Sequence, residues 1–207
     1  DRLDRFAARE RGAPPEHPTG RLVALRLADG TVAWEQDDDI FGTMCAISET
    51  HDVLLLSYQA SSYRLESEKG NRLAAFRVSS GERLWDVPAV YASRPIINDR
   101  TIYIQPGAWD LLTGEKLDFS FSRAYGCGTL SGSRHLLLYR SGTLGYTDLQ
   151  CDLGTENYGG VRPGCWINTI AADGLVLMPD ATDRCTCSYL MKTSMALRPF
   201  GIRPPIM

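Results

Sequence analysis

Hydrophobic and polar residues alternate in short runs along most of the chain, and polar turns separate the runs. One phrase consists of a strand, a glycine-containing turn and a second strand. It occurs as GRLVALRLADGTVAW (20–34), as NRLAAFRVSSGERLW (71–85) and, shortened, as GAWDLLTGEKLDF (107–119), with degenerate copies at 144–149 and 193–199. Period-two alternation bounded by turn residues is typical of half-buried β-strands. Each copy therefore predicts a β-hairpin.

A second phrase alternates with the first and consists of a strand, a polar turn and a more apolar strand. It stands at 44–58, 93–105, 126–140 and 165–179. Together the two phrases supply up to four short antiparallel strands, and they recur at the roughly 40 to 50 residues that are typical of one propeller blade. We therefore predict an all-β fold, a partial β-propeller of about four antiparallel four-stranded blades.

The first residues have a different pattern. Leu3, Phe6 and Ala7 lie at helical spacing among charged residues, and Gly12 ends this run, which predicts a short amphipathic N-terminal helix. The proline-rich stretch that follows is predicted to be an extended linker. The expected organisation is a helix and linker over 1–19 and propeller blades over 20–207.

Composition narrows the classes of function. The chain has 207 residues and a formal net charge of -3, and its basic residues are scattered, so we expect no nucleic-acid partner. The longest apolar runs have the length of a strand, which predicts no membrane-spanning segment. Six cysteines favour an oxidising compartment, so the expected localisation is periplasmic or secreted.

The repeated phrase resembles the repeat of quinoprotein-dehydrogenase-like, or pyrroloquinoline-quinone-like, β-propellers, written Ala-x-Asp-x-x-Thr-Gly-x-x-x-Trp. Three segments carry the resemblance: Ala24 to Trp34, Ala75 to Trp85, and Ala108 through Gly114. The alanine-to-glycine spacing is kept in all three, whereas the third copy lacks the final tryptophan. The second half of the chain looks like the C-terminal segment of larger bacterial proteins of this kind. The resemblance implies about half of a closed ring, completed by further blades of the same protein or by another polypeptide.

The tryptophans of the repeat are expected to pack between neighbouring blades, because a blade buries its apolar faces only against the next blade. The candidates for this docking role are Trp34, Trp85 and Trp109.

The cysteines in the second half form the densest unusual cluster. A hairpin over 165–180 would place Cys165 near the stretch that contains Cys185 and Cys187, and Cys127 begins the preceding hairpin at the equivalent position. We expect these four to be disulfide candidates within the usual Cα separation. A zinc site and buried free thiols are the alternatives, and six cysteines allow 15 pairings.

Polar and aromatic residues in the loops of the second half are candidates for ligand binding, since loops at a blade entrance often carry function. The candidates are Arg140, Tyr146, Asn157, Arg162, Trp166 and Asn168. Structural glycine turns and a buried tryptophan are the alternative explanation for the same residues.

No catalytic motif is recognisable, and we predict no catalytic residue and no metal site. In true quinoproteins of the family, the resemblance implies a disulfide between adjacent cysteines against the quinone and a calcium ion, but Thr186 separates Cys185 from Cys187 here. We therefore expect no cofactor, with pyrroloquinoline quinone and calcium as the alternative. The expected function is a non-catalytic scaffold or binding module of a larger protein; the alternative is part of a quinone-dependent dehydrogenase or a polysaccharide-acting enzyme.

Overall fold

The computed structural model describes residues 20–42, 44–58, 71–151, 153–180, 187 and 193–199. These residues form β-strands and no helix, which confirms the predicted all-β class. The N-terminal helix expected over 1–12 lies outside the described residues.

Three sheets contain four antiparallel strands each, in the order in which the strands occur along the chain. Blade 1 consists of β3 (Met44–Ser48), β4 (Val53–Ser57), β5 (Arg72–Arg77) and β6 (Arg83–Pro88). Blade 2 consists of β7 (Ile96–Asn98), β8 (Thr101–Ile104), β9 (Gly107–Asp110) and β10 (Lys116–Ser120). Blade 3 consists of β11 (Ser131–Gly132), β12 (Leu136–Ser141), β13 (Thr143–Asp148) and β14 (Thr155–Asn157).

The sheets at the two ends of the series are smaller among the described residues. The first is the hairpin of β1 (Gly20–Leu25) and β2 (Val32–Ile40), and the last, blade 4, has β15 (Ile170–Ala172), β16 (Leu175–Met178) and β17 (Met195–Leu197). The other copies of the phrase at 20–34 form the third and fourth strands of blades 1 and 2. The β1–β2 hairpin therefore corresponds to the outer half of a blade.

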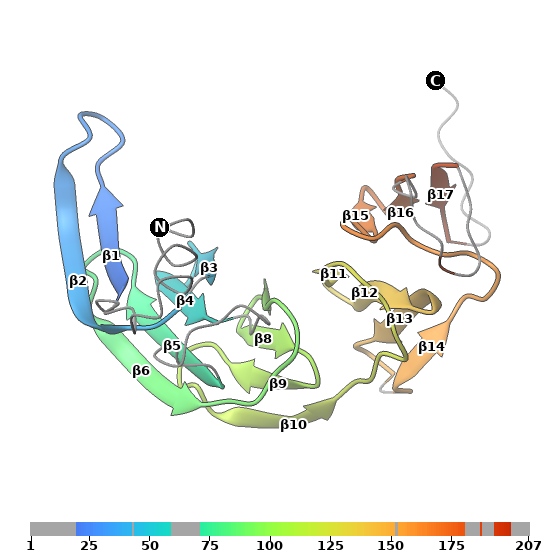
Figure 1. Ribbon diagram of the computed structural model, residues 1–207, viewed down its shortest axis with the longest axis horizontal. Helices are drawn as coiled ribbons and strands as arrows, with labels where there is room; N and C mark the ends of the chain where they lie inside the picture. Colours follow the sequence, from blue (N-terminus) through green and yellow to red (C-terminus); the bar gives the residue numbers. More distant parts are fainter. Residues whose placement is uncertain are drawn as a thin grey trace, which may run out of the picture.

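The sheets follow one another around an open arc (Figure 1). The first strands of successive blades contact one another, β3 with β7, β7 with β11 and β11 with β15. The fourth strands β6 and β10 lie on the outer side of the arc. Radial strand order with the first strand innermost is the arrangement of a propeller.

Blade 1 is covered on both faces, which explains the uninterrupted apolar run of β4. Leu54, Leu56 and Phe76 pack on the side of the β1–β2 hairpin, in a cluster with Leu22 and Trp34. The alternate residues face the other way, in a cluster that joins blade 1 to blade 2, formed by Val53, Leu55, Leu73, Ala75, Ile102, Ile104, Trp109 and Leu111. Burial on both faces favours a continuous apolar strand over an alternating one.

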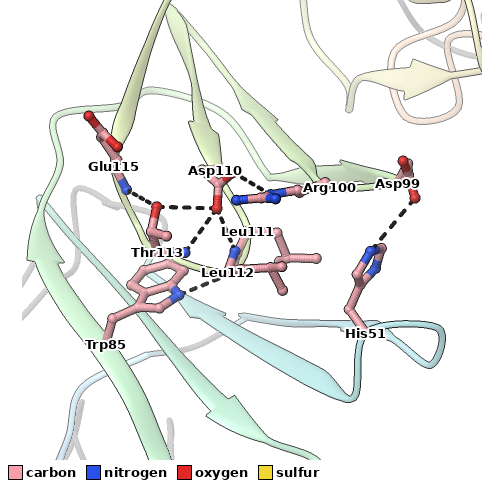
Figure 2. Close-up of polar contacts among 9 residues, drawn as sticks. All are labelled: His51, Trp85, Asp99, Arg100, Asp110, Leu111, Leu112, Thr113 and Glu115. Atoms are coloured by element: carbon pink, nitrogen blue, oxygen red, sulfur yellow. Dashed lines mark hydrogen bonds and ion pairs between the residues drawn. The ribbon is translucent and has the colours of Figure 1, made fainter.

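Two tryptophans of the repeat lie against the glycine turn of the next sheet. The indole Nε1 of Trp34 donates to the carbonyl of Val78 at 2.7 Å, and that of Trp85 donates to the carbonyl of Leu111 at 2.9 Å (Figure 2). Each contact joins the outer strand of one sheet to the turn between the third and fourth strands of its neighbour. Trp109 has a different place, because it lies on the third strand of blade 2 and is buried in the core between blades 1 and 2.

The glycine of each turn faces the tryptophan ring. A Cβ atom at Gly81 would lie 2.6 Å from Cε3 of Trp34, and one at Gly114 would lie 2.7 Å from Cε3 of Trp85. Both glycines have positive φ, 76° and 72°. The repeat therefore needs glycine here for backbone conformation and for close approach of the ring.

Blade 3 meets blade 2 without such a tryptophan, because the third copy of the phrase lacks it. Aromatic rings take its place. Phe121, just after β10, lies 5.5 Å from Tyr139 of β12 between centroids, and the edge-to-face pair of Tyr103 and Phe119 within blade 2, 5.2 Å between centroids, packs against the same cluster. Edge-to-face and tilted aromatic pairs contribute stability beyond the area that they bury. The repeat thus keeps its blade contact although its sequence changes.

An aspartate orders the turn that receives Trp85 (Figure 2). Oδ1 of Asp110 accepts hydrogen bonds from the amides of Leu112 and Thr113, both at 2.9 Å, and Oδ2 accepts one from Nε of Arg100 at 2.7 Å. Burial works against the charged carboxylate, but these hydrogen bonds outweigh it and hold the pKa of Asp110 below its usual value. The aspartate of the repeat therefore has a structural role in this turn.

We expect Gly114→Ala to lower the free energy of unfolding by about 2–4 kcal/mol, because the new methyl group adds positive-φ strain and overpacks the Trp85 ring. Gly30→Ala is a matched control, since Gly30 has φ 71° and a Cβ atom there would meet no neighbouring atom within 4 Å. We expect that change to cost only the strain, about 1–2 kcal/mol. Urea unfolding followed by circular dichroism measures both, and equal losses would contradict the ring contact.

Candidate functional site

A mostly apolar cavity of about 640 Å³ lies between blades 3 and 4. Blade 3 lines it with Leu138, Leu144 and Tyr146, and blade 4 with Val176 and Leu197. Polar side chains also line it, among them Ser133, His135, Asp173 and Arg198. Apolar walls with few polar groups are typical of small-molecule and peptide sites.

Of the six predicted ligand-binding residues, only Tyr146 lines this cavity. Tyr146 is on β13 and pairs with Glu156 of β14. A hydrogen bond with the Glu156 side chain, together with burial, raises the pKa of the Tyr146 hydroxyl.

Arg140 and Asn168 form a separate, buried polar cluster. They are 0% and 1% exposed, and the amide of Arg140 donates to Oδ1 of Asn168 at 3.1 Å. Nδ2 of Asn168 donates to the carbonyls of Cys127 at 3.1 Å and Gly164 at 2.6 Å. One asparagine side chain thus satisfies backbone groups of three segments that are far apart in sequence.

Two glycines allow these segments to approach. A Cβ atom at Gly126 would lie 2.7 Å from Cγ of Arg140, and one at Gly128 would lie 2.2 Å from Nδ2 of Asn168. The Gly126-Cys127-Gly128 sequence therefore serves close packing around the buried cluster.

The other three candidates have different environments. Arg162 is 2% exposed, Trp166 is 80% exposed, and Asn157 is exposed at the end of β14. The structure therefore divides the predicted set into cavity, buried cluster and surface, and the binding role of each residue stays a prediction.

The guanidinium of Arg140 lies among thiols and an aromatic ring. Its Nη1 is 3.6 Å from Sγ of Cys165, and its Cζ is 5.4 Å from the centroid of Tyr125. Burial works to lower the pKa of Arg140, but hydrogen bonds with Cys187 and Tyr125 outweigh it, so the pKa is raised. Sequence reasoning missed this contact, because Arg140 and Cys165 belong to different repeats and no spacing rule joins them.

The predicted hairpin after Cys165 forms, but it is shorter than expected. Its first strand, β15, begins at Ile170, and Ala172 pairs with Leu175 across the turn. Cys165 therefore lies in the loop before the strand and not within the ladder. No disulfide joins two of the described cysteines, Cys185 lies outside the described residues, and the disulfide pairing stays a prediction.

The described residues contain no group of three His, Cys, Asp or Glu side chains placed to hold a metal ion. The adjacent-cysteine disulfide of the quinoproteins is also missing from the sequence. The described residues thus do not fit a quinone and calcium site, and we derive no reaction step through one. The expectation that the chain holds no cofactor stays a prediction.

No protein-family model and no curated protein matches the sequence. Solved structures do match the fold. BamB from Moraxella catarrhalis matches 78% of this chain with a TM-score of 0.51 and 14% identity, and the computationally designed Ika8 protein matches 78% with a TM-score of 0.52 and 12% identity. The quinohemoprotein alcohol dehydrogenase ADHIIG from Pseudomonas putida HK5 matches 88% with a TM-score of 0.47 and 13% identity.

The chain has a β-propeller fold, and the predicted resemblance to quinoprotein-like propellers is confirmed at the level of the fold. The match spans 57% of the BamB chain and 50% of the Ika8 chain. The described residues include no helix long and apolar enough to cross a membrane.

Proposed function

We propose that this chain is a non-catalytic propeller module, acting as a scaffold or binding surface of a larger periplasmic or secreted protein. Further blades of that protein or another polypeptide complete its ring. The observation that carries the proposal is the outward face of the β1–β2 hairpin.

This face exposes apolar side chains in neighbouring ladder positions. Leu25 pairs with Val32, and the two are 58% and 51% exposed, while Val23 next to them is 39% exposed. The opposite face of the same hairpin packs on blade 1 through Leu22 and Trp34. The hairpin thus has one covered face and one open face with the alternation of a blade, which favours another blade as the covering element.

The inner edge of the hairpin supports the same conclusion. β1 pairs with β2 and, among the described strands, with no other. In blades 1 to 3 the corresponding third strand pairs on both sides. An open strand edge beside an exposed apolar face invites association with another chain.

We expect the 207-residue chain to self-associate as its concentration rises, because none of the described blades covers this face. A Val23→Lys/Leu25→Lys variant should shift to the monomer mass, since two ammonium groups would have to be desolvated in the contact. Light scattering after size-exclusion chromatography measures the mass. Val90→Lys is the control, because Val90 is 74% exposed in the loop between blades 1 and 2.

A wild-type chain that stays monomeric at every concentration would contradict the open end face. The non-catalytic role has its own test, which is addition of pyrroloquinoline quinone and calcium to the folded chain. A new absorption band or reduction of a redox dye would contradict that role and favour the dehydrogenase alternative.

A further inference from the structure

The turn between β1 and β2, which we call the hairpin turn (26–31), has the same backbone conformation as the two turns that receive tryptophans. In each turn the amide of the glycine donates to the carbonyl four residues before it, at 2.8 Å for Gly30 and Gly81 and at 2.9 Å for Gly114. The φ angles of the three glycines lie between 71° and 76°. The hairpin turn therefore already has the conformation that docks an indole in blades 1 and 2.

The surroundings of Gly30 differ from those of the other two turn glycines. Gly81 and Gly114 are buried beneath the indole rings that they receive. Gly30 is exposed, and a Cβ atom there would meet no neighbouring atom within 4 Å. The space that a ring occupies in the other two turns is thus open in the hairpin turn.

The hairpin turn also has a carbonyl in the position that accepts the indole N–H. Leu27 stands three residues before its turn glycine, as Val78 and Leu111 do. The carbonyls of those two residues accept the hydrogen bonds of the docked indoles. The side chain of Leu27 is fully exposed, whereas that of Leu111 is buried. A buried indole needs both an apolar surface and an acceptor for its N–H, and the hairpin turn presents the two together.

Charged side chains on the hairpin repeat a second contact between sheets. In blade 1, Arg72 forms an ion pair with Asp86 of its own blade and another with Asp39 of β2, at 2.7 Å. By position in the repeat, Arg21 corresponds to Arg72, and it pairs with Glu35 of its own hairpin at 2.9 Å. The Arg21 side chain is 64% exposed, so it can contact an acidic side chain of a partner as well.

We propose that the hairpin turn and Arg21 bind the outer strand of another blade, which presents a tryptophan and, five residues later, an acidic side chain. Trp34 and Asp39 have this spacing on β2, the strand that docks on blade 1. The partner's indole lies on Gly30 and donates its N–H to the carbonyl of Leu27. This inference rests on the proposed ring completion and names the side chains that the completing blade uses.

The tryptophans of a second copy of this chain do not match this partner. The chain has four tryptophans, of which Trp34 and Trp85 are already docked and Trp109 is buried between blades 1 and 2. Trp166 is exposed, but it lies in the loop before β15 and has Ala171 five residues later. Self-association of the isolated chain would cover the apolar face of the hairpin and leave the hairpin turn open.

The test uses the isotope-labelled 207-residue chain, with a synthetic peptide of residues 30–40, GTVAWEQDDDI, as the probe. Nuclear magnetic resonance of the chain's amides should show saturable shifts over 26–31 and none over 77–82, where Trp34 of the chain already occupies the equivalent turn. A peptide with an N-methylated indole should bind about three- to tenfold more weakly, because it lacks the N–H donor. The Trp34→Ala peptide should produce no shifts over 26–31.

Variants of the chain test the same contact from the other side. Gly30→Ala should weaken binding by about tenfold or more, because the new methyl group takes the place of the ring. Gly154→Ala is the matched control with unchanged affinity, since Gly154 has φ 74° and a Cβ atom there would meet no neighbouring atom within 4 Å. Arg21→Gln should weaken binding about twofold, and high salt should remove this difference.

Shifts that spread over all three turns, shifts that persist in Gly30→Ala, or no shifts at millimolar peptide would each overturn the proposal. Loss of self-association in a Trp166→Phe chain would assign the hairpin turn to a second copy and overturn the choice of partner. A chain that self-associates but binds no peptide would refute the indole contact and leave ring completion standing. A chain that does neither would refute both.

Discussion

Trp85→Ala should lower the free energy of unfolding by about 3–5 kcal/mol, the range for removing a large aromatic side chain from a packed site. Trp85 joins blade 1 to blade 2, because its indole donates to the carbonyl of Leu111 and its ring lies on Gly114. Alanine would leave a cavity between the blades and a carbonyl without its donor. Urea unfolding followed by far-ultraviolet circular dichroism measures the loss.

Two further variants separate the causes of this effect. Trp85→Phe keeps an aromatic ring but cannot donate to Leu111, so we expect a loss of about 1–3 kcal/mol. Trp166→Ala is the control for tryptophan removal, since Trp166 is 80% exposed, and should change stability by no more than about 0.5 kcal/mol. Similar losses for the two alanine variants would show that Trp85 has no special role between the blades.

Asn168→Leu should cost about 2–4 kcal/mol, because buried polar groups that lose their partners keep their desolvation penalty. The change removes the acceptor of the Arg140 amide and the donor of the Cys127 and Gly164 carbonyls. Thermal unfolding and hydrogen exchange at the Arg140 amide measure the effect, and we expect faster exchange at that amide.

The matched control is Asn157→Leu, the same substitution at an exposed position of β14. It should change stability by no more than about 0.5 kcal/mol. Asn168→Asp tests the direction of the hydrogen bonds, because aspartate accepts from the Arg140 amide but cannot donate to the two carbonyls while ionised. Unchanged stability and exchange in Asn168→Leu would show that the three segments do not depend on this side chain.

Much of the fold is readable from the sequence because propeller repeats are local. Each hairpin needs only alternating strands and a turn, and the four-residue step from Gly81 to Trp85 repeats that from Gly30 to Trp34. The sequence shows less clearly which position in a blade, from first to fourth strand, each predicted strand takes. The phrase at 20–34 predicts a hairpin, but its neighbours in space determine that β1 and β2 correspond to outer strands.

The candidate site is less predictable than the fold. Loop composition indicates Arg140 and Asn168 together, and they are in fact hydrogen bonded, but the same composition also indicates Trp166, which is exposed. The predicted length of the first strand in this hairpin is wrong, because the residues before Ile170 form a loop in which the Asn168 side chain donates a hydrogen bond to the carbonyl of Gly164. Alternation cannot distinguish a strand from a loop held by side-chain hydrogen bonds.

The hairpins, the turns, the all-β class and the propeller architecture follow from the sequence, because these depend on side-chain periodicity and on glycine at fixed steps. Only the packed structure shows which faces are covered and which distant groups meet. Trp85 contacts Leu111, and Arg140 contacts Cys165. Each contact joins two different repeats, so no local sequence pattern indicates it. The physical reason is that burial, and therefore the energetic value of a charge or a hydrogen bond, is set by the neighbouring blade.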